Sequence, residues 1–344
     1  MSESSYLPER KIEIDKEGFP VFSGLRADDE TLLFEYAKNL KRSVEGENKF
    51  PLITKCGGVE VWVESFDCPL VAQSIRAFSE TSCEWVFPGG YSAKVSHNQM
   101  SVDRWERLHA FIGKDEIPAV FSRKAQAEFL SKINVETFRP QPYWPNVDEV
   151  SSASRWDSAY REEKQGWEMG GVNPALSHYG LPSLLQEGSS VLVPGAGRGH
   201  DAEWISQRKA KVTALDFSPL AQAEFRMSYP TSSVEYRSDD VFEYLKASSE
   251  SFDGIFEHTI FCAINPSRRL EYLDGVYNAL KADGIYFGLF FQLSWVGGPP
   301  FGLTQWELNE LIKDRFNIKA WEIAEGSHPR RKGRELWAVL QKKS

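Results

Sequence analysis

The chain of 344 residues has few cysteines and few histidines. Its four cysteines include no C-x-x-C pair, and its six histidines are scattered along the sequence. These counts exclude a disulfide framework and provide no metal-ligand spacing. We therefore expect free thiols, no bound metal and a reducing, cytoplasmic location.

Long apolar runs and an excess of basic residues are also missing. No stretch approaches the ~20 apolar residues that span a bilayer, and the amino terminus lacks the basic and apolar regions of a signal peptide. The formal net charge of -9 argues against a dedicated nucleic-acid binder. We expect neither a membrane nor a nucleic-acid partner, and the sequence leaves the oligomeric state open.

What the chain does contain is enough apolar material for roughly two domains, since 41% of its residues are hydrophobic. Three prolines fall within residues 139–145, which indicates an extended connection. We predict an α+β domain at 1–138, a proline-rich linker at 139–150 and a second domain at 151–344.

The first domain shows secondary-structure patterns but no recognisable function. We predict a strand at 11–14, a helix capped by Asp28 or Asp29, and hairpins around Gly57-Gly58 and Pro88-Gly-Gly90. Two more helices are expected at 101–111 and 122–132. Its aromatic residues, such as Trp62 and Trp85, are more typical of a core than of a ligand platform.

The second domain is organised around a glycine-rich turn. The apolar run Val191–Val193 enters a turn containing Gly195, Gly197 and Gly199, and a helical pattern follows. Strand, glycine turn and helix form the first unit of a nucleotide-binding sheet. The spacing is G-x-G-x-G, whereas a dinucleotide site requires G-x-G-x-x-G. Followed by Asp216 at the next strand end, this pattern favours S-adenosylmethionine, although a purely structural turn remains an alternative.

Strand and helix patterns alternate after this turn. We expect strands at 190–194, 211–215, 233–237, 252–257, 284–292, 317–324 and 334–340, and helices at 199–208, 218–228, 240–247, 266–281 and 304–314. Such alternation predicts a doubly wound, mostly parallel α/β sheet. The final two strands have no helix between them, so we expect them to pair antiparallel.

Several motifs in order resemble the thiopurine S-methyltransferase family, which includes plant halide and thiol methyltransferases. The run Val191-Leu-Val-Pro-Gly-Ala-Gly-Arg-Gly199 resembles VLVPGCGKG, and Leu215-Asp-Phe-Ser218 resembles LDIS. Asp240-Val-Phe242 resembles DFF, and 252–268 resembles FDLIFDYTFFCAIPPSMR. Gly297-Gly-Pro-Pro-Phe301, the R-GRE-like ending at 331–335, and Trp156 with the segment 166–170 complete the match over about residues 144–341.

The resemblance implies a class I methyltransferase: a Rossmann-like, seven-stranded sheet with an antiparallel last strand, here preceded by the separate α+β domain. It implies S-adenosyl-L-methionine as cofactor. The implied cofactor-binding residues are Trp156, Trp167, Gly195, Gly197, Asp216, Asp240, Val241, Glu257 and Thr259. The implied substrate pocket includes Phe301, Arg331 and Arg334.

The family's pattern is not followed everywhere. Ala196 and Arg198 replace its Cys and Lys, and Glu257-His258-Thr259 stands where the family has DYT. His258 is our candidate general base, although a histidine more often satisfies a local hydrogen bond.

From this resemblance we expect methyl transfer from S-adenosylmethionine to a small soft nucleophile (a thiol, thiopurine, halide, or selenium or tellurium species) by in-line displacement. Such nucleophiles need little proton abstraction, because a thiol with a pKa of ~8.5 is already partly ionised at neutral pH. The alternatives are an O- or N-methyltransferase acting on small molecules, or a non-catalytic S-adenosylmethionine sensor. Release of S-adenosylhomocysteine would separate an enzyme from a sensor.

Overall fold

The computed structural model describes residues 11–43, 52–144, 147–162, 165–293 and 297–344, and these fall into two compact units. The first unit contains the described residues up to Trp144, together with Leu293 and Thr304–Glu307. The second unit contains the remaining described residues. A short segment from the carboxy-terminal half of the sequence therefore belongs to the first unit.

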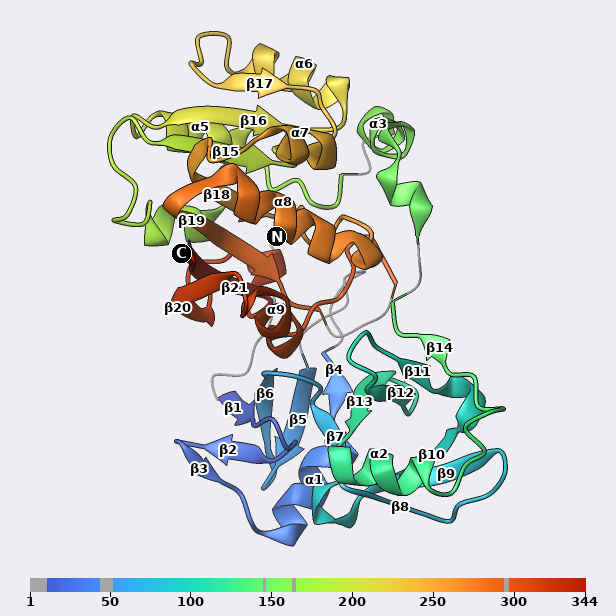
Figure 1. Ribbon diagram of the computed structural model, residues 1–344. Helices are drawn as coiled ribbons and strands as arrows, with labels where there is room; N and C mark the ends of the chain where they lie inside the picture. The colour runs from blue at the N-terminus through green and yellow to red at the C-terminus, as the bar shows by residue number, and fades with distance from the viewer. Residues whose placement is uncertain (1–10, 44–51, 145–146, 163–164, 294–296) are drawn as a thin grey trace. The chain divides into compact units, whose positions relative to one another are not determined.

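The first unit combines a six-stranded, a five-stranded and a three-stranded sheet with two α-helices (Figure 1). The six-stranded sheet has the order β3-β2-β1-β6-β5-β4, formed by Leu25–Arg26, Pro20–Phe22, Lys11–Ile14, Val59–Ser65, Leu52–Cys56 and Lys41–Arg42. The five-stranded sheet has the order β14-β11-β12-β13-β7, formed by Gln141–Pro142, Ser101–Val102, Leu108–Ile112, Ile117–Phe121 and Leu70–Ala72. The three-stranded sheet has the order β10-β9-β8, formed by Ser92–Ser96, Ser82–Val86 and Ser74–Arg76. The helices are α1 (Glu30–Asn39) and α2 (Arg123–Leu130).

Most of the local predictions for this unit are confirmed. Asp29 caps α1 by accepting a hydrogen bond from the backbone N–H of Leu32, 2.7 Å away. Both predicted hairpins form, since β5 pairs antiparallel with β6 and β9 with β10. Trp85 is fully buried and stacks on Phe121 at 3.9 Å between ring centroids, as expected of a core aromatic residue.

The predicted helix at 101–111 is wrong. The structure has β11 and β12 in this stretch, joined by a turn. The Asp103 carboxylate accepts the backbone N–H groups of Trp105 and Arg107, each at 2.9 Å. This side chain thereby closes a turn where a helix would need those donors for its own first residues.

The proline-rich stretch begins as part of the first unit. Gln141–Pro142 forms β14, which pairs parallel with β11, and Tyr143 is buried. Proline fits this position because β14 lies at the edge of its sheet, where a missing N–H group costs little.

The second unit contains a seven-stranded sheet with the order β17-β16-β15-β18-β19-β21-β20 (Figure 1). In that order the strands are Glu235–Arg237, Lys211–Leu215, Ser190–Pro194, Phe252–His258, Leu280–Phe291, Glu335–Lys342 and Phe316–Ile323. Pairings among β15 to β19 are parallel, whereas β21 runs antiparallel to both of its neighbours. This is the class I methyltransferase sheet that the sequence predicts.

The helices of this unit are α3 (Ala153–Arg161), α4 (Pro174–Tyr179), α5 (His200–Ser206), α6 (Pro219–Ser228), α7 (Val241–Ala247), α8 (Arg269–Ala279) and α9 (Gln305–Ile312), of which α9 begins in the first unit. Figure 1 shows α7 and α8 side by side along the sheet. Within the described ranges, none of the helices is both long and apolar enough to cross a membrane.

Candidate active site

The glycine turn between β15 and α5 places bare backbone at the carboxyl end of the sheet. Gly195, Gly197 and Gly199 have φ values of 61°, 56° and 74°. A Cβ atom on Gly199 would lie 2.3 Å from the Phe225 ring, so a side chain is sterically excluded there. The Tyr236 hydroxyl donates a hydrogen bond to the Gly197 carbonyl, which stabilises the conformation of the turn.

Asp216 follows β16 and faces this turn. One carboxylate oxygen accepts the backbone N–H of Gly197 and the other accepts that of Ser218, both at 2.9 Å. Burial raises the pKa of Asp216 to about 6, against the effect of these donors. At neutral pH the group is therefore mainly ionised, and a carboxylate, with about four acceptor sites, can accept a ligand hydroxyl in addition to these backbone donors.

Three aromatic side chains cluster beside the glycine turn. Trp167 packs edge to face against Trp156 and Tyr160, at centroid distances of 5.6 and 5.9 Å. A Cβ atom on Gly197 would lie 3.4 Å from the Tyr160 hydroxyl and 4.0 Å from Trp167 Nε1. The two tryptophans predicted to bind the cofactor are thus together, and Tyr160 joins them. Its position four residues after Trp156 on α3 was the sequence signal for a shared helix face.

A hydrogen bond ties α3 to the loop after β16. The Ser218 hydroxyl, which is buried, donates to the Asp157 carboxylate. Because Asp157 lies next to Trp156 in the chain, this bond fixes the helix that carries the aromatic cluster beside Asp216. Sequence reasoning missed Asp157, since nothing in the local pattern of α3 indicates a partner 61 residues away.

Asp240 and Val241 lie at the start of α7, where β17 has ended. The Asp240 carboxylate caps this helix by accepting the N–H groups of Phe242 and Glu243, at 2.7 and 3.1 Å. Asp240 is partly exposed, whereas Val241 is buried. Asp240, predicted to bind the cofactor, thus also serves as the N-cap of α7.

Glu257 is the penultimate residue of β18, and its side chain lies within the core. It is fully buried, and its oxygens accept hydrogen bonds from Phe261 N–H (2.9 Å), the Tyr286 hydroxyl (2.6 Å) and the Tyr272 hydroxyl (3.4 Å). Burial raises the pKa of Glu257 to about 7. This carboxyl group supports the turn after β18, in which Thr259 has a φ of 70°. Such a value is strained for a β-branched residue.

His258 is held by three other side chains. Its Nδ1 lies 2.6 Å from Asp201 Oδ2, and its Nε2 lies 3.0 Å from Asn173 Nδ2 and 2.9 Å from an Arg331 nitrogen. Asn173 Nδ2 and Arg331 can only donate, so Nε2 is the acceptor and Nδ1 carries the proton that is shared with Asp201. Both ring nitrogens are therefore engaged.

The two arginines predicted for the substrate pocket are buried, with exposed fractions of 5% for Arg331 and 6% for Arg334. Arg331 binds Glu335 at 3.3 Å and donates to the Trp167 carbonyl at 2.7 Å. Arg334 donates to the Arg330 carbonyl, and both buried guanidinium groups lie about 5 Å from the Phe291 ring. Burial lowers the pKa of Arg334 to about 10.

Phe301 is fully buried, and its backbone N–H donates to the Cys262 carbonyl at 2.7 Å. The structure thus joins residues 297–301 to the loop that follows β18. Cys262 itself is buried, and burial raises the pKa of its thiol to about 12, which leaves it protonated and unreactive.

These groups fit a nucleoside-bearing cofactor with a cationic sulfur. The turn exposes backbone without Cβ atoms, Asp216 offers a carboxylate suited to ribose hydroxyls, and Trp156 and Trp167 offer aromatic faces suited to a cation. The structure gathers Gly195, Gly197, Asp216 and the tryptophans around one turn, while Glu257 lies in the core.

Comparison with known proteins agrees with this geometry. The thiopurine S-methyltransferase family matches residues 151–343. Thiocyanate methyltransferase 1 of Arabidopsis thaliana is 34% identical over 187 residues, covering 52% of this chain and 81% of that protein. Thiopurine S-methyltransferase of Aliivibrio salmonicida is 25% identical over 206 residues, covering 54% and 97%.

Solved structures also align with the chain. The 1,6-didemethyltoxoflavin-N1-methyltransferase of Burkholderia thailandensis, solved with S-adenosylhomocysteine, has 20% identity and a TM-score of 0.46, covering 70% of this chain and 96% of that one. The family match extends over more than half of the sequence and includes the glycine turn, Asp216 and the antiparallel last strand. The chain therefore belongs to the thiopurine S-methyltransferase family and is an S-adenosylmethionine-dependent methyltransferase.

Proposed function

We propose that this enzyme methylates a small soft nucleophile: a thiol, a thiopurine, a halide or pseudohalide, or a selenium or tellurium species. The names of two relatives, a thiocyanate methyltransferase and a thiopurine S-methyltransferase, support this class of acceptor. Acceptors of this class are small and polarisable, and they react without strong base catalysis.

The observation that supports this class best is the bonding of His258. An alcohol or ammonium acceptor must lose a proton to become nucleophilic, and His258 was the candidate base. Its Nε2 accepts from Arg331 and Asn173, and its Nδ1 is bonded to Asp201. A base whose lone pair is already occupied is poorly placed to take a substrate proton. Ionised thiols and halides do not need this step.

Bound S-adenosylmethionine would supply a methyl group on its sulfonium. The acceptor would attack this carbon in line, and the carbon–sulfur bond would break as S-adenosylhomocysteine leaves. In our proposal Asp216 accepts the ribose hydroxyls, Gly195 and Gly197 line the methionyl part, and Asp240 and Val241 lie beside the adenine. Trp156 and Trp167 cover the site and exclude water, which favours a reaction that disperses charge. Thr259 lies where the acceptor and methyl group meet.

We propose that buried positive charge holds the acceptor. Arg331 pairs with Glu335 at 3.3 Å, and Arg334 lies near the charges of Arg331 and Glu335 and about 5 Å from the Phe291 ring. With a pKa of about 10, Arg334 stays protonated at neutral pH. An anionic nucleophile would be attracted to this charge. Phe301 completes the apolar side of the pocket in this proposal.

The test is a panel of acceptors incubated with labelled S-adenosylmethionine, with S-adenosylhomocysteine release as the measurement. Thiols, thiopurines, thiocyanate, iodide and selenite should be methylated faster than alcohols or amines. Arg334→Ala should raise KM for anionic acceptors, while the exposed Lys332→Ala serves as a matched control. Preference for a cationic amine would contradict the proposal and favour the O- or N-methyltransferase alternative.

A further inference from the structure

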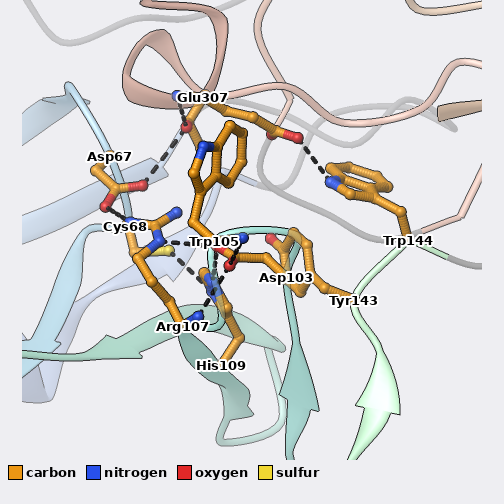
Figure 2. A pocket seen from close by; sticks show the side chains of 10 residues that line it. Asp67, Cys68, Asp103, Trp105, Arg107, His109, Tyr143, Trp144 and Glu307 are labelled. Carbon is orange, nitrogen blue, oxygen red and sulfur yellow. Dashed lines mark hydrogen bonds and ion pairs between the residues drawn. The ribbon is translucent and has the colours of Figure 1, made fainter. Parts of the chain in front are cut away.

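The first unit contains a buried polar cluster, formed by Asp67, Asp103, Arg107 and His109 (Figure 2). Arg107 bonds Asp67 at 2.6 Å and Asp103 at 2.7 Å, and His109 Nε2 lies 2.9 Å from Asp103. Burial alone would raise the pKa of Asp103, but its hydrogen bond to His109 and the charge of Arg107 hold that pKa low. We call these four residues the Arg107 cluster.

The cluster is suited neither to nucleophilic catalysis by a cysteine nor to binding an organic ligand. Cys68 Sγ lies 3.8 Å from His109 Nδ1, so a cysteine–histidine–aspartate arrangement is present. However, burial raises the pKa of Cys68 well above its usual range, and a protonated, buried thiol is not a nucleophile. The space left among the lining residues has room for about one water molecule, which excludes an organic ligand.

The cluster instead holds residues 304–307 of the same chain. The Arg107 guanidinium lies over the Trp306 ring, 3.3 Å from its centroid, and Trp105 packs edge to face on the same ring at 4.9 Å. Trp306 N–H donates to the Phe66 carbonyl at 2.6 Å. Stacking, packing and a backbone hydrogen bond together fix Trp306 in the first unit.

The residues on either side of Trp306 are held in the same way. The Thr304 hydroxyl lies 3.5 Å from the Asp67 carboxylate, and Trp144 Nε1 donates to Glu307 at 2.7 Å. Glu307 is buried, with an exposed fraction of 5%. Figure 2 shows the Glu307 side chain reaching toward the Trp144 indole.

These anchored residues directly follow residues 297–303, which include Phe301 of the predicted substrate pocket and which we call the acceptor rim. Residues 297–303 belong to the second unit, whereas Leu293 before them and 304–307 after them belong to the first. The rim itself is bonded to the loop after β18 through Phe301, and its Gly302 carbonyl accepts from the buried Arg269 at 2.9 Å. Trp306 lies two residues after Thr304, and Thr304 directly follows the rim in the chain, so the anchored residues and the rim are covalently continuous.

We propose that the Arg107 cluster positions the acceptor rim, so that Trp306 and Arg107 set the enzyme's affinity for its methyl acceptor without touching the cofactor. This inference rests on the proposed function, because it assumes that residues 297–303 line the acceptor pocket. According to this inference, the first unit contributes to acceptor binding. Both residues are positioning residues, since they act through the rim.

The kinetic test compares Trp306→Ala with Trp306→Phe in the full-length enzyme. Trp306→Ala removes the ring that Arg107 covers and should raise KM for the best acceptor about three- to tenfold, with kcat and cofactor affinity changed less than about twofold. Trp306→Phe keeps an aromatic face and should restore most of the acceptor affinity. Arg76→Ala is the matched control, because Arg76 binds Glu84 on the surface of the same unit.

Amide hydrogen exchange provides a readout that does not depend on turnover. In cofactor-saturated protein, Trp306→Ala should increase exchange across 297–303, and Arg76→Ala should not. Unchanged exchange there, or equal losses of acceptor and cofactor affinity, would overturn the inference. If none of the acceptors is methylated, the proposed function fails, and the exchange experiment still decides whether the cluster positions this segment.

Discussion

At the residue scale, Asp216 links the protonation state of the protein to cofactor binding. Its carboxylate accepts the backbone N–H groups of Gly197 and Ser218, both at 2.9 Å, and the residue is partly exposed. Because burial raises its pKa to about 6, the group gains a proton in mildly acidic solution. A protonated carboxyl group has fewer acceptor sites for ribose hydroxyls.

Asp216→Ala should weaken S-adenosylmethionine binding by roughly 1–3 kcal/mol, measured by calorimetry. In the native protein, affinity should fall as the pH drops below about 6, by up to tenfold per pH unit, because binding then requires loss of the proton. Asp239→Ala, which removes an exposed partner of Arg237, should leave binding unchanged. Equal affinity in Asp216→Ala, or tight binding of NAD, would contradict this assignment.

His258 illustrates how a reactive residue type can serve as a structural connector. Through Asp201, Asn173 and Arg331 it joins the starts of α5 and α4 to the loop before β21. Arg331 in turn donates to the Trp167 carbonyl beside the cofactor turn.

His258→Gln should therefore lower kcat/KM for a thiol by less than about tenfold and leave the pH–rate profile governed by the acceptor's own pKa. Loss of a general base would instead cost roughly 10²–10⁴-fold. Steady-state kinetics with thiols of different pKa distinguish the two outcomes. A large loss with preserved cofactor affinity would restore His258 as the base.

At the scale of elements, β18 is connected to α8 and β19 through Glu257. Tyr272 of α8 and Tyr286 of β19 both donate to this carboxyl group, and Phe261 N–H binds it from the following turn. Burial makes the charged form unfavourable despite these donors, so the pKa of Glu257 rises from 4.5 to about 7.

Because the pKa of Glu257 is higher in the folded protein than in the unfolded chain, the free energy of unfolding should decrease as the pH rises. The stabilising contribution of Glu257 is fully present below pH 4.5, the pKa of this group in the unfolded chain. It is lost as the pH rises through about 7, its pKa in the folded protein. Glu257→Gln should remove this decline. Between pH 5 and about 8, the free energy of unfolding should therefore fall by roughly 1–3 kcal/mol less in the variant than in the native protein. Denaturant unfolding at several pH values measures the difference, and parallel pH curves would contradict it.

At the scale of the whole molecule, the chain passes from the first unit to the second and returns for residues 304–307. All seven strands of the methyltransferase sheet lie in the second unit, as do Asp216 and the glycine turn. The partners of Trp306, including Phe66 and Arg107, lie in the amino-terminal part of the sequence.

A fragment of residues 140–344 should therefore fold and bind S-adenosylmethionine, because its sheet and cofactor turn are complete. It should have weaker acceptor binding than the full chain, since Trp306 loses its contacts with Arg107. Calorimetry with the cofactor and initial rates with a thiol test both parts. An insoluble fragment, or one unable to bind the cofactor, would show that the first unit is needed for the fold of the second.

The sequence by itself determined the features that depend on neighbours in the chain. The alternation of strands and helices predicted the doubly wound sheet, and the glycine spacing with Asp216 predicted the cofactor turn. Hairpins and helix caps, such as Asp29, were also predictable, because turn and cap preferences act over two to four residues.

Only the tertiary structure decided what depends on burial and on distant partners. Asp157, Asn173 and Tyr236 reach the site through bonds across 39 to 85 residues, which leave no local pattern. The stretch 101–111 has helical spacing of apolar residues but lies in a sheet, since Asp103 closes a turn and β12 gains its partners from β11 and β13. Burial is a property of the whole fold. Within the basic run at 330–334, Arg330 and Lys332 are exposed, whereas Arg331 and Arg334 are buried.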